Sequence, residues 1–156
     1  AIALTFAMAV IVISLRVRAL RLARRNAATL AKWRPVLVRA AAGEVVDVPH
    51  LPAVQCLPLL LLWNQLQESL RGESHDRLNV LGERLGLYTL ARRLEDSRYL
   101  AARVLGHATL GHFAIPSDWQ RLDAGMQELN TPASLAAARA LLRIDAQPAA
   151  PHVLER

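Results

Sequence analysis

The sequence predicts an all-α protein built from antiparallel helix pairs, and three observations lead to this prediction. Apolar residues recur at spacings of three, four and seven, which places them along one face of a helix. Glycine and proline interrupt this pattern at Gly72, Pro116 and Pro132. The one stretch rich in β-branched residues, 44–48, is bounded by glycine and proline and is expected to be a loop.

The composition is that of one folded domain with a short appendage. The chain has 156 residues, of which 53% are hydrophobic and only 4% aromatic, so the core must consist mainly of Leu, Ala and Val. Cys56 is the only cysteine, which excludes an internal disulfide framework and a cysteine-rich zinc module.

The net charge of +6 is concentrated in one segment. Residues 1–43 contain eight basic side chains and no acidic one, whereas the remainder contains eleven basic and thirteen acidic side chains. A basic protein often binds nucleic acid, but here the body of the chain is slightly acidic. The charge pattern therefore does not favour a nucleic-acid partner.

Residues 1–15 read AIALTFAMAVIVISL and predict a membrane anchor. Fifteen helical residues reach about 22 Å, and a bilayer core is about 30 Å thick, so we expect further apolar residues upstream or snorkelling by Arg16. A signal peptide is less consistent, because its positive charges precede the apolar region. A buried core helix is the remaining alternative.

Basic residues follow the apolar run directly and indicate its orientation. Positive charges favour the cytoplasmic side of a span, so we expect residues 16–156 in the cytoplasm and contact with membrane lipid through residues 1–25. The membrane-flanking basic residues are Arg16, Arg18, Arg21, Arg24 and Arg25.

No glycine or proline interrupts residues 1–34, so one helix is expected to extend from the membrane to about Trp33. Its second half either lies on the lipid surface as an amphipathic helix or forms a solvated stalk, with Trp33 at the level of the headgroups. This gives two regions, a transmembrane and basic juxtamembrane helix at 1–33 and a helical-repeat domain at 34–156.

The rest of the chain is predicted to form a series of short helices. The first begins at Pro58, because proline suits the first turn of a helix. The expected helices span 58–71, 78–85, 87–96, 97–112, 116–129, 132–144 and 149–154.

Two helix pairs resemble each other in sequence. Residues 101–105 match 137–141 at an offset of 36, and Leu87, Ala91 and Leu94 match residues 122, 126 and 129 at an offset of 35. A period in the thirties that holds two helices is typical of an α-solenoid. We therefore expect Leu105 and Leu141 to occupy equivalent buried positions.

The segment 129–151 carries a resemblance to a known family. A polar turn with Pro132, an alanine-rich helix with Ala137, Ala138 and Leu141, and a terminal Asp145 are similar to a HEAT repeat. With the motifs at 62–64, 70–72 and 110–112, the chain resembles a group of bacterial HEAT-repeat proteins with an N-terminal membrane span, over about residues 55–156. The resemblance implies a HEAT-like α-solenoid and a role as an accessory to a membrane-bound enzyme, such as a polysaccharide glycosyltransferase.

The histidines do not predict a metal or catalytic site. His107 and His112 are five residues apart, or about 140° around a helix, which is unfavourable for a shared metal. We expect surface or capping positions for both. Ser74, His75 and Asp76 contain the groups of a hydrolytic triad, but adjacent residues cannot adopt its geometry, so a polar turn is expected.

Two further candidates have simpler structural explanations. Cys56 suits a reactive thiol or a palmitoylation site, and a small buried residue is the preferred interpretation. Several acidic residues suit an acidic site, but helix-start charges on a solvated face are preferred. They are Glu95, Asp96, Asp118, Asp123 and Glu128.

The sequence thus predicts a scaffold, not an enzyme, with no catalytic residue, cofactor, metal or small-molecule ligand. The expected protein is anchored by a single span in a bacterial inner membrane and binds a partner protein at the cytoplasmic face. One alternative is a nucleic-acid-binding HEAT-like protein that uses the basic segment 16–39. Another is an enzyme of unknown type.

Overall fold

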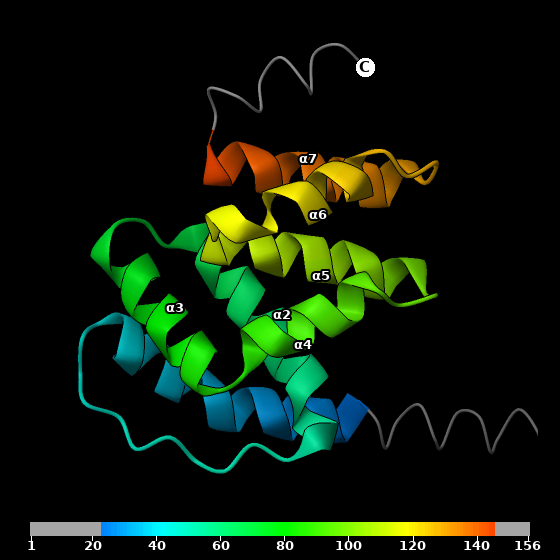
Figure 1. Ribbon diagram of the computed structural model, residues 1–156. Helices are drawn as coiled ribbons and strands as arrows, with labels where there is room; N and C mark the ends of the chain where they lie inside the picture. The colour runs from blue at the N-terminus through cyan, green and yellow to red at the C-terminus, as the bar shows by residue number, and fades with distance from the viewer. Residues whose placement is uncertain (1–22, 146–156) are drawn as a thin grey trace, which may run out of the picture.

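The computed structural model describes residues 23–145, and this part of the chain is helical without any strand (Figure 1). Residues 23–41 are helical and precede an extended connection. The helices that follow are α2 (Ala53–Ser69), α3 (Glu73–Arg84), α4 (Leu87–Glu95), α5 (Leu100–Phe113), the 3₁₀ turn η1 (Pro116–Asp118), α6 (Trp119–Met126) and α7 (Thr131–Ile144). The prediction of an all-α protein is confirmed.

The predicted membrane span at 1–15 and the predicted helix at 149–154 lie outside the described residues. Within residues 23–145, no helix combines the length and the apolar character that crossing a bilayer requires.

The start of α2 differs from the prediction. The helix begins at Ala53, so Pro58 lies in its second turn and not at its start, and one backbone hydrogen bond is lost there. A tertiary contact fixes this earlier start, because Gln55 Oε1 accepts a hydrogen bond of 3.2 Å from Trp33 Nε1. The connection at 44–48 is a loop, as predicted.

Trp33 is fully buried, so its predicted position at the lipid headgroups is wrong. Together with Leu37 it packs against Leu59 and Leu60 of α2 in the first hydrophobic core. The indole ring finds an apolar site and a hydrogen-bond acceptor in the helical body, which the local sequence around residue 33 could not reveal. The predicted region boundary at residue 33 therefore falls inside the helical span 23–41.

Two clusters of buried side chains form the core. The first joins residues 33–40 to α2, α3 and the start of α4, and Trp63 lies at its centre, stacked on Phe113 with ring centroids 4.9 Å apart. The second cluster lies among α4, α5, α6 and α7, where Leu110, Leu122 and Leu141 are fully buried.

Helices α4 to α7 form two successive antiparallel pairs, stacked in Figure 1. The close approaches of Gly111 to Ala140 and of Gly125 to both His107 and Ala137 show that α5 and α7 run in the same direction. On the other side, Tyr88 of α4 meets Asp118 just before α6. Helix α5 thus lies beside its counterpart α7, and α4 meets the segment before α6 through the contact between Tyr88 and Asp118.

The two pairs repeat with a period of 31 residues, not the predicted 35 or 36. Helices α5 and α7 both contain 14 residues and begin at 100 and 131, while α4 and α6 end at 95 and 126. In this register Leu110 is equivalent to Leu141 and Ala91 to Leu122, and all four are fully buried.

The predicted register is wrong because its equivalent positions have different environments. Leu105 is only partly buried, whereas Leu141 is fully buried, and Leu129 lies beyond the end of α6 with 102% of its surface exposed. Alanine and leucine recur at spacings of both three and four in these helices, so several alignments match equally well. A period of 31 is also shorter than the about 40–47 residues of HEAT repeats.

Candidate interaction groove and basic pocket

Of the predicted membrane-flanking residues, Arg24 and Arg25 are exposed on the helical span 23–41. Arg16, Arg18 and Arg21 lie outside the described residues. The exposure of the described pair is compatible with contact to lipid headgroups, and it does not test the prediction.

The predicted surface positions of His107 and His112 are wrong, because their exposed fractions are only 1% and 2%. Helix α5 is central and contacts α2, α4 and α7, so nearly its whole circumference is buried over its second half. The two side chains point in different directions from this helix. The rings of His112 and Trp63 form a T-shaped contact with their centroids 5.8 Å apart. The His107 ring packs closely on Gly125, because a Cβ atom added to this glycine would lie 2.7 Å from Cε1 of the ring.

The predicted solvated face is wrong for Glu95 and Asp118, which are buried, whereas Asp96 is exposed. Glu95, which is buried, pairs with Arg121 at 3.0 Å, and Glu128 pairs with Arg103 at 3.0 Å. Asp118 is buried, and the Tyr88 hydroxyl lies 3.0 Å from both of its oxygens. Burial and the Asp118 carboxylate raise the pKa of Tyr88.

No group of three His, Cys, Asp or Glu side chains within residues 23–145 is placed to hold a metal ion. Asp123 is partly buried, and Asp96 pairs with Arg121 at 3.2 Å. These acidic side chains therefore join α4, α5 and α6 through separate contacts, and none of them converges on a common ligand position.

The segment Ser74 to Asp76 lies in the first turn of α3, where a polar turn was predicted. His75 Nδ1 is 3.5 Å from Asp76 Oδ1, and both belong to the same helical turn. Cys56 is partly buried and its thiol lies 3.7 Å from the carbonyl oxygen of Pro52. Neither feature provides a nucleophile with a base and an orienting group.

A groove of about 360 Å³ runs between α5 and α7, and we call it the α5–α7 groove. Its floor is apolar, while Arg139, Arg143 and Glu68 provide the charges along its edges. The apolar residues that line it are Val104, Ala108, Pro132, Leu135, Ala136 and Ala140. The alanine side chains on both helices are short and leave room in the groove for a side chain of another molecule.

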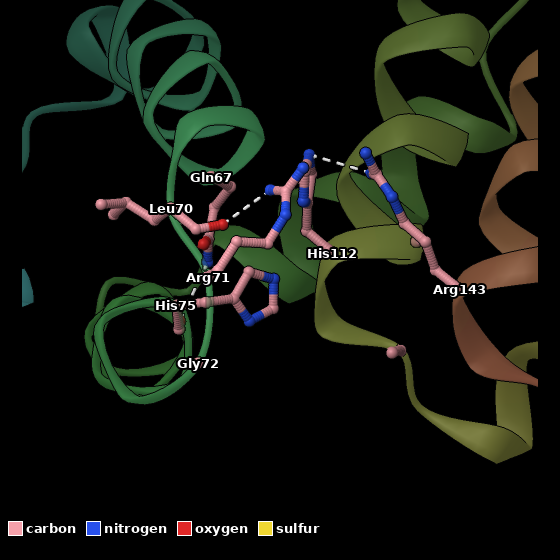
Figure 2. Close-up of a pocket in the computed structure, with 9 residues that line it drawn as sticks. Gln67, Leu70, Arg71, Gly72, His75, His112 and Arg143 are labelled. Carbon is pink, nitrogen blue, oxygen red and sulfur yellow. Dashed lines mark hydrogen bonds between the residues drawn. The ribbon is translucent and has the colours of Figure 1, made fainter.

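A second hollow, of about 410 Å³, lies where the end of α2, the start of α3 and the ends of α5 and α7 meet, and we call it the basic pocket. Figure 2 shows Arg143 reaching from α7 toward His112, with Arg71 and His75 on the side of α2 and α3. Arg143 lines both hollows, so its side chain lies between the basic pocket and the α5–α7 groove.

The guanidinium group of Arg143 fixes the state of His112. Arg143 Nη1 lies 3.1 Å from His112 Nε2, and because an arginine only donates, this nitrogen must accept. Burial, followed by the charges of Arg143, His75 and Arg71, lowers the pKa of His112 to about 3. His112 is therefore neutral at pH 7, with its proton on Nδ1.

Neither Arg71 nor Arg143 was predicted to be a site residue. They are separated by 71 residues that fold into five helices and a turn, and the motif at 70–72 that contains Arg71 predicted a repeat fold and not a binding site. Only the tertiary structure brings their side chains to one pocket.

No family model matches the chain, and no curated protein or solved structure matches it either. The proposed function therefore depends on the geometry and chemistry of the two hollows.

Proposed function

We propose that the protein is a membrane-anchored helical-repeat scaffold that binds a partner protein at the cytoplasmic face of a bacterial inner membrane. The apolar run 1–15 and its flanking arginines supply the anchor, and the α5–α7 groove supplies the contact surface. The resemblance to HEAT-repeat proteins suggests a membrane-bound enzyme as the partner, such as a polysaccharide glycosyltransferase.

The observation that carries this proposal is the chemistry of the α5–α7 groove. Leu135, which lines the groove, is 53% exposed, so a large apolar side chain beside a row of alanines is accessible to a partner.

The charges beside the groove indicate which partner segment fits. Arg139 and Arg143 give the groove a net positive edge, because Glu68 is the only acidic residue that lines it. An amphipathic helix with apolar residues at spacings of three and four and with acidic residues beside them would fill the floor and pair with these arginines. The proposed occupant is therefore an acidic amphipathic segment of the partner protein.

The repeat arrangement supports the same role. Two successive helix pairs have equivalent buried residues, and stacked pairs commonly present an extended binding surface. The alternative of nucleic-acid binding through residues 16–39 has no comparable support among the described residues.

The test is photo-crosslinking in native membranes with the full chain. A photoreactive residue at position 135 should label one segment of one membrane-associated protein, and the same residue at position 61 should not. Leu61 is the matched control because it is also 53% exposed but lies on α2, outside the groove.

Charge exchange then tests the proposed occupant. Arg139→Glu should weaken binding at least tenfold, and a Glu→Lys or Asp→Lys change in the labelled segment should restore it. Equal labelling from positions 61 and 135, or a labelled segment without acidic residues, would contradict the proposal.

A further inference from the structure

We infer that the basic pocket is a binding site for a doubly charged tetrahedral oxyanion of the phosphate monoester type. This inference goes beyond the proposed scaffold function and shares only Arg143 with the α5–α7 groove, so Arg71 tests the pocket and Arg139 tests the groove separately. It rests on the charge of the pocket and on the way the arginines are held.

The pocket has a positive charge that no lining carboxylate neutralises. Its lining residues are Gln67, Leu70, Arg71, Gly72, His75, Gly111, His112, Ala114 and Arg143. Neither Arg71 nor Arg143 lies within ion-pair distance of a carboxylate of residues 23–145. The arginines of this part of the chain that do form ion pairs are Arg39, Arg77, Arg103 and Arg121. Glu68 is the acidic group that acts on Arg143, and it lies on the groove side.

Both arginines are held in place by the protein itself. Arg71 Nη1 donates to the carbonyl oxygens of Glu68 at 3.0 Å and Leu70 at 2.7 Å, at the end of α2. Arg143 Nη1 donates to His112 Nε2. Each guanidinium group has five N–H donors, so the remaining ones are oriented but unused in these contacts. Such preorganisation lowers the entropy lost when an anion binds.

The wall of the pocket contains buried polar atoms without a protein partner. Within the described structure, His112 Nδ1 and Gln67 Oε1 are buried and form no hydrogen bond. Because His112 is neutral and accepts at Nε2, its Nδ1 carries a hydrogen that has no acceptor. Neither atom has accessible surface, and an amide oxygen cannot donate to an anion, so the two arginines supply the donors that an anion would meet.

The start of α3 adds a weaker attraction. This helix has 12 residues, begins after Gly72 in the pocket wall, and has no side-chain cap hydrogen bond. A helix N-terminus carries a partial positive charge. Glu73 and Asp76 in the first turn oppose it, but Glu73 pairs with Arg77 and neither acid lines the pocket.

The charge balance indicates a divalent anion. A phosphate monoester carries about −1.5 to −2 charges at pH 7 and can accept from two guanidinium groups at once. A single carboxylate would neutralise only one of the two arginines. The same phosphoryl chemistry can come from a soluble metabolite or from a lipid headgroup, and the experiment must separate the two sources.

The test uses the full 156-residue chain in a non-ionic maltoside detergent, titrated with inorganic phosphate and followed by calorimetry and by the arginine and histidine side-chain signals in NMR. Phosphate should saturate one site and shift the signals of Arg71, Arg143 and His112. Arg71→Gln and Arg143→Gln should each weaken binding at least tenfold, and acetate should bind at least tenfold more weakly than phosphate.

The control variant is Arg84→Gln with Arg93→Gln. It removes the same charge from exposed positions outside the pocket and should change the affinity less than twofold. Equal phosphate binding by wild type and the Arg71→Gln, Arg143→Gln double variant would overturn the proposal, as would equal binding of acetate.

A second pair of variants keeps both arginines. Ala114 lines the pocket and has a φ of 52°, a conformation that Asp and Asn tolerate. Ala114→Asp should bind phosphate at least tenfold more weakly than the nearly isosteric Ala114→Asn. Equal affinity of the two would show that phosphate binds elsewhere.

The source of the anion is tested with vesicles of phosphatidylcholine with or without phosphatidic acid. Pocket-dependent binding to phosphatidic acid that inorganic phosphate does not compete assigns the site to a lipid, and competition assigns it to a free phosphate compound. If binding to phosphatidic acid is unchanged in the double variant and inorganic phosphate does not bind, the inference is wrong.

Discussion

A Cβ atom on Gly111 would lie 2.7 Å from the Cα of Ala140, so α5 and α7 contact each other backbone to backbone at this point. Real Cβ atoms do not approach other atoms so closely, so a methyl group here must push the two helices apart. Glycine at this position thus determines the spacing of the two parallel helices and the depth of the α5–α7 groove.

Gly111→Ala is therefore expected to destabilise the protein, although alanine is the better helix former by about 1 kcal/mol. Overpacking costs about 1–3 kcal/mol. We expect this cost to exceed the gain in helix propensity, so the free energy of unfolding should fall. Denaturant titration of the full chain measures this change. An unchanged or higher unfolding midpoint would mean that the helices separate without cost.

The 31-residue period predicts which leucines matter most for stability. Leu110→Ala and Leu141→Ala should each cost about 2–5 kcal/mol, because both positions are fully buried. Leu105→Ala should cost clearly less, since Leu105 is only partly buried. If the free energies of unfolding showed Leu105 and Leu141 to be equally important, the 36-residue register would be the better description.

The helix at α4 was predicted almost to its ends from its apolar stripe at Leu87, Leu90, Ala91 and Leu94 and from the acidic pair that follows the stripe. The helix at α7 followed similarly from the break at 130–132. Local spacing and helix-breaking residues are sufficient for these features.

Tertiary contacts determined the features that the sequence did not reveal. Whether His107 and His112 are buried depends on α5 being surrounded by three other helices, and the basic pocket depends on bringing Arg71 next to Arg143. The small side chains Gly111 and Ala140 set the register between α5 and α7, but alanine and glycine are too common in this chain to mark a contact by themselves.

The buried histidines predict a stability that falls on acidification. Burial lowers the pKa of His112 to about 3 and that of His107 below its usual value of 6.5, so the unfolded chain binds more protons than the folded chain below pH 6.5. The free energy of unfolding therefore has its full value above the histidine pKa of the unfolded chain, and it decreases as the pH falls toward the histidine pKa of the folded protein. At pH 5 the loss is about 2 kcal/mol for His112. His107 adds to the loss in the same direction.

Denaturant titrations between pH 7.5 and pH 5 measure this effect before the carboxylates protonate. His112→Gln retains a polar side chain that does not titrate, so it should remove the part of the pH dependence that His112 contributes. The same slope in the variant and the wild type would mean that other groups cause the loss.

The ion pair between Arg121 and Glu95 predicts a smaller, salt-sensitive effect. Glu95 is buried and Arg121 is about one-third exposed, so solvent screens part of the interaction. Arg121→Gln should lower the free energy of unfolding by about 1 kcal/mol, and the difference from wild type should shrink in 1 M salt. Arg93→Gln on the same side of the molecule forms no ion pair and should have no such effect. A difference that does not depend on salt would assign the loss to packing of the arginine stem.

The last prediction concerns the anchor that the sequence indicates at residues 1–15. An unpaired arginine at the bilayer centre costs about 2.5–3.5 kcal/mol on insertion scales, so the five arginines between residues 16 and 25 should remain on the side where the chain is made. The protein should stay in the membrane during carbonate extraction, and a reporter fused to its C-terminus should be active in the cytoplasm. Release by carbonate would indicate a peripheral protein. Reporter activity outside the cytoplasm would reverse the orientation and would place the α5–α7 groove opposite any cytoplasmic partner.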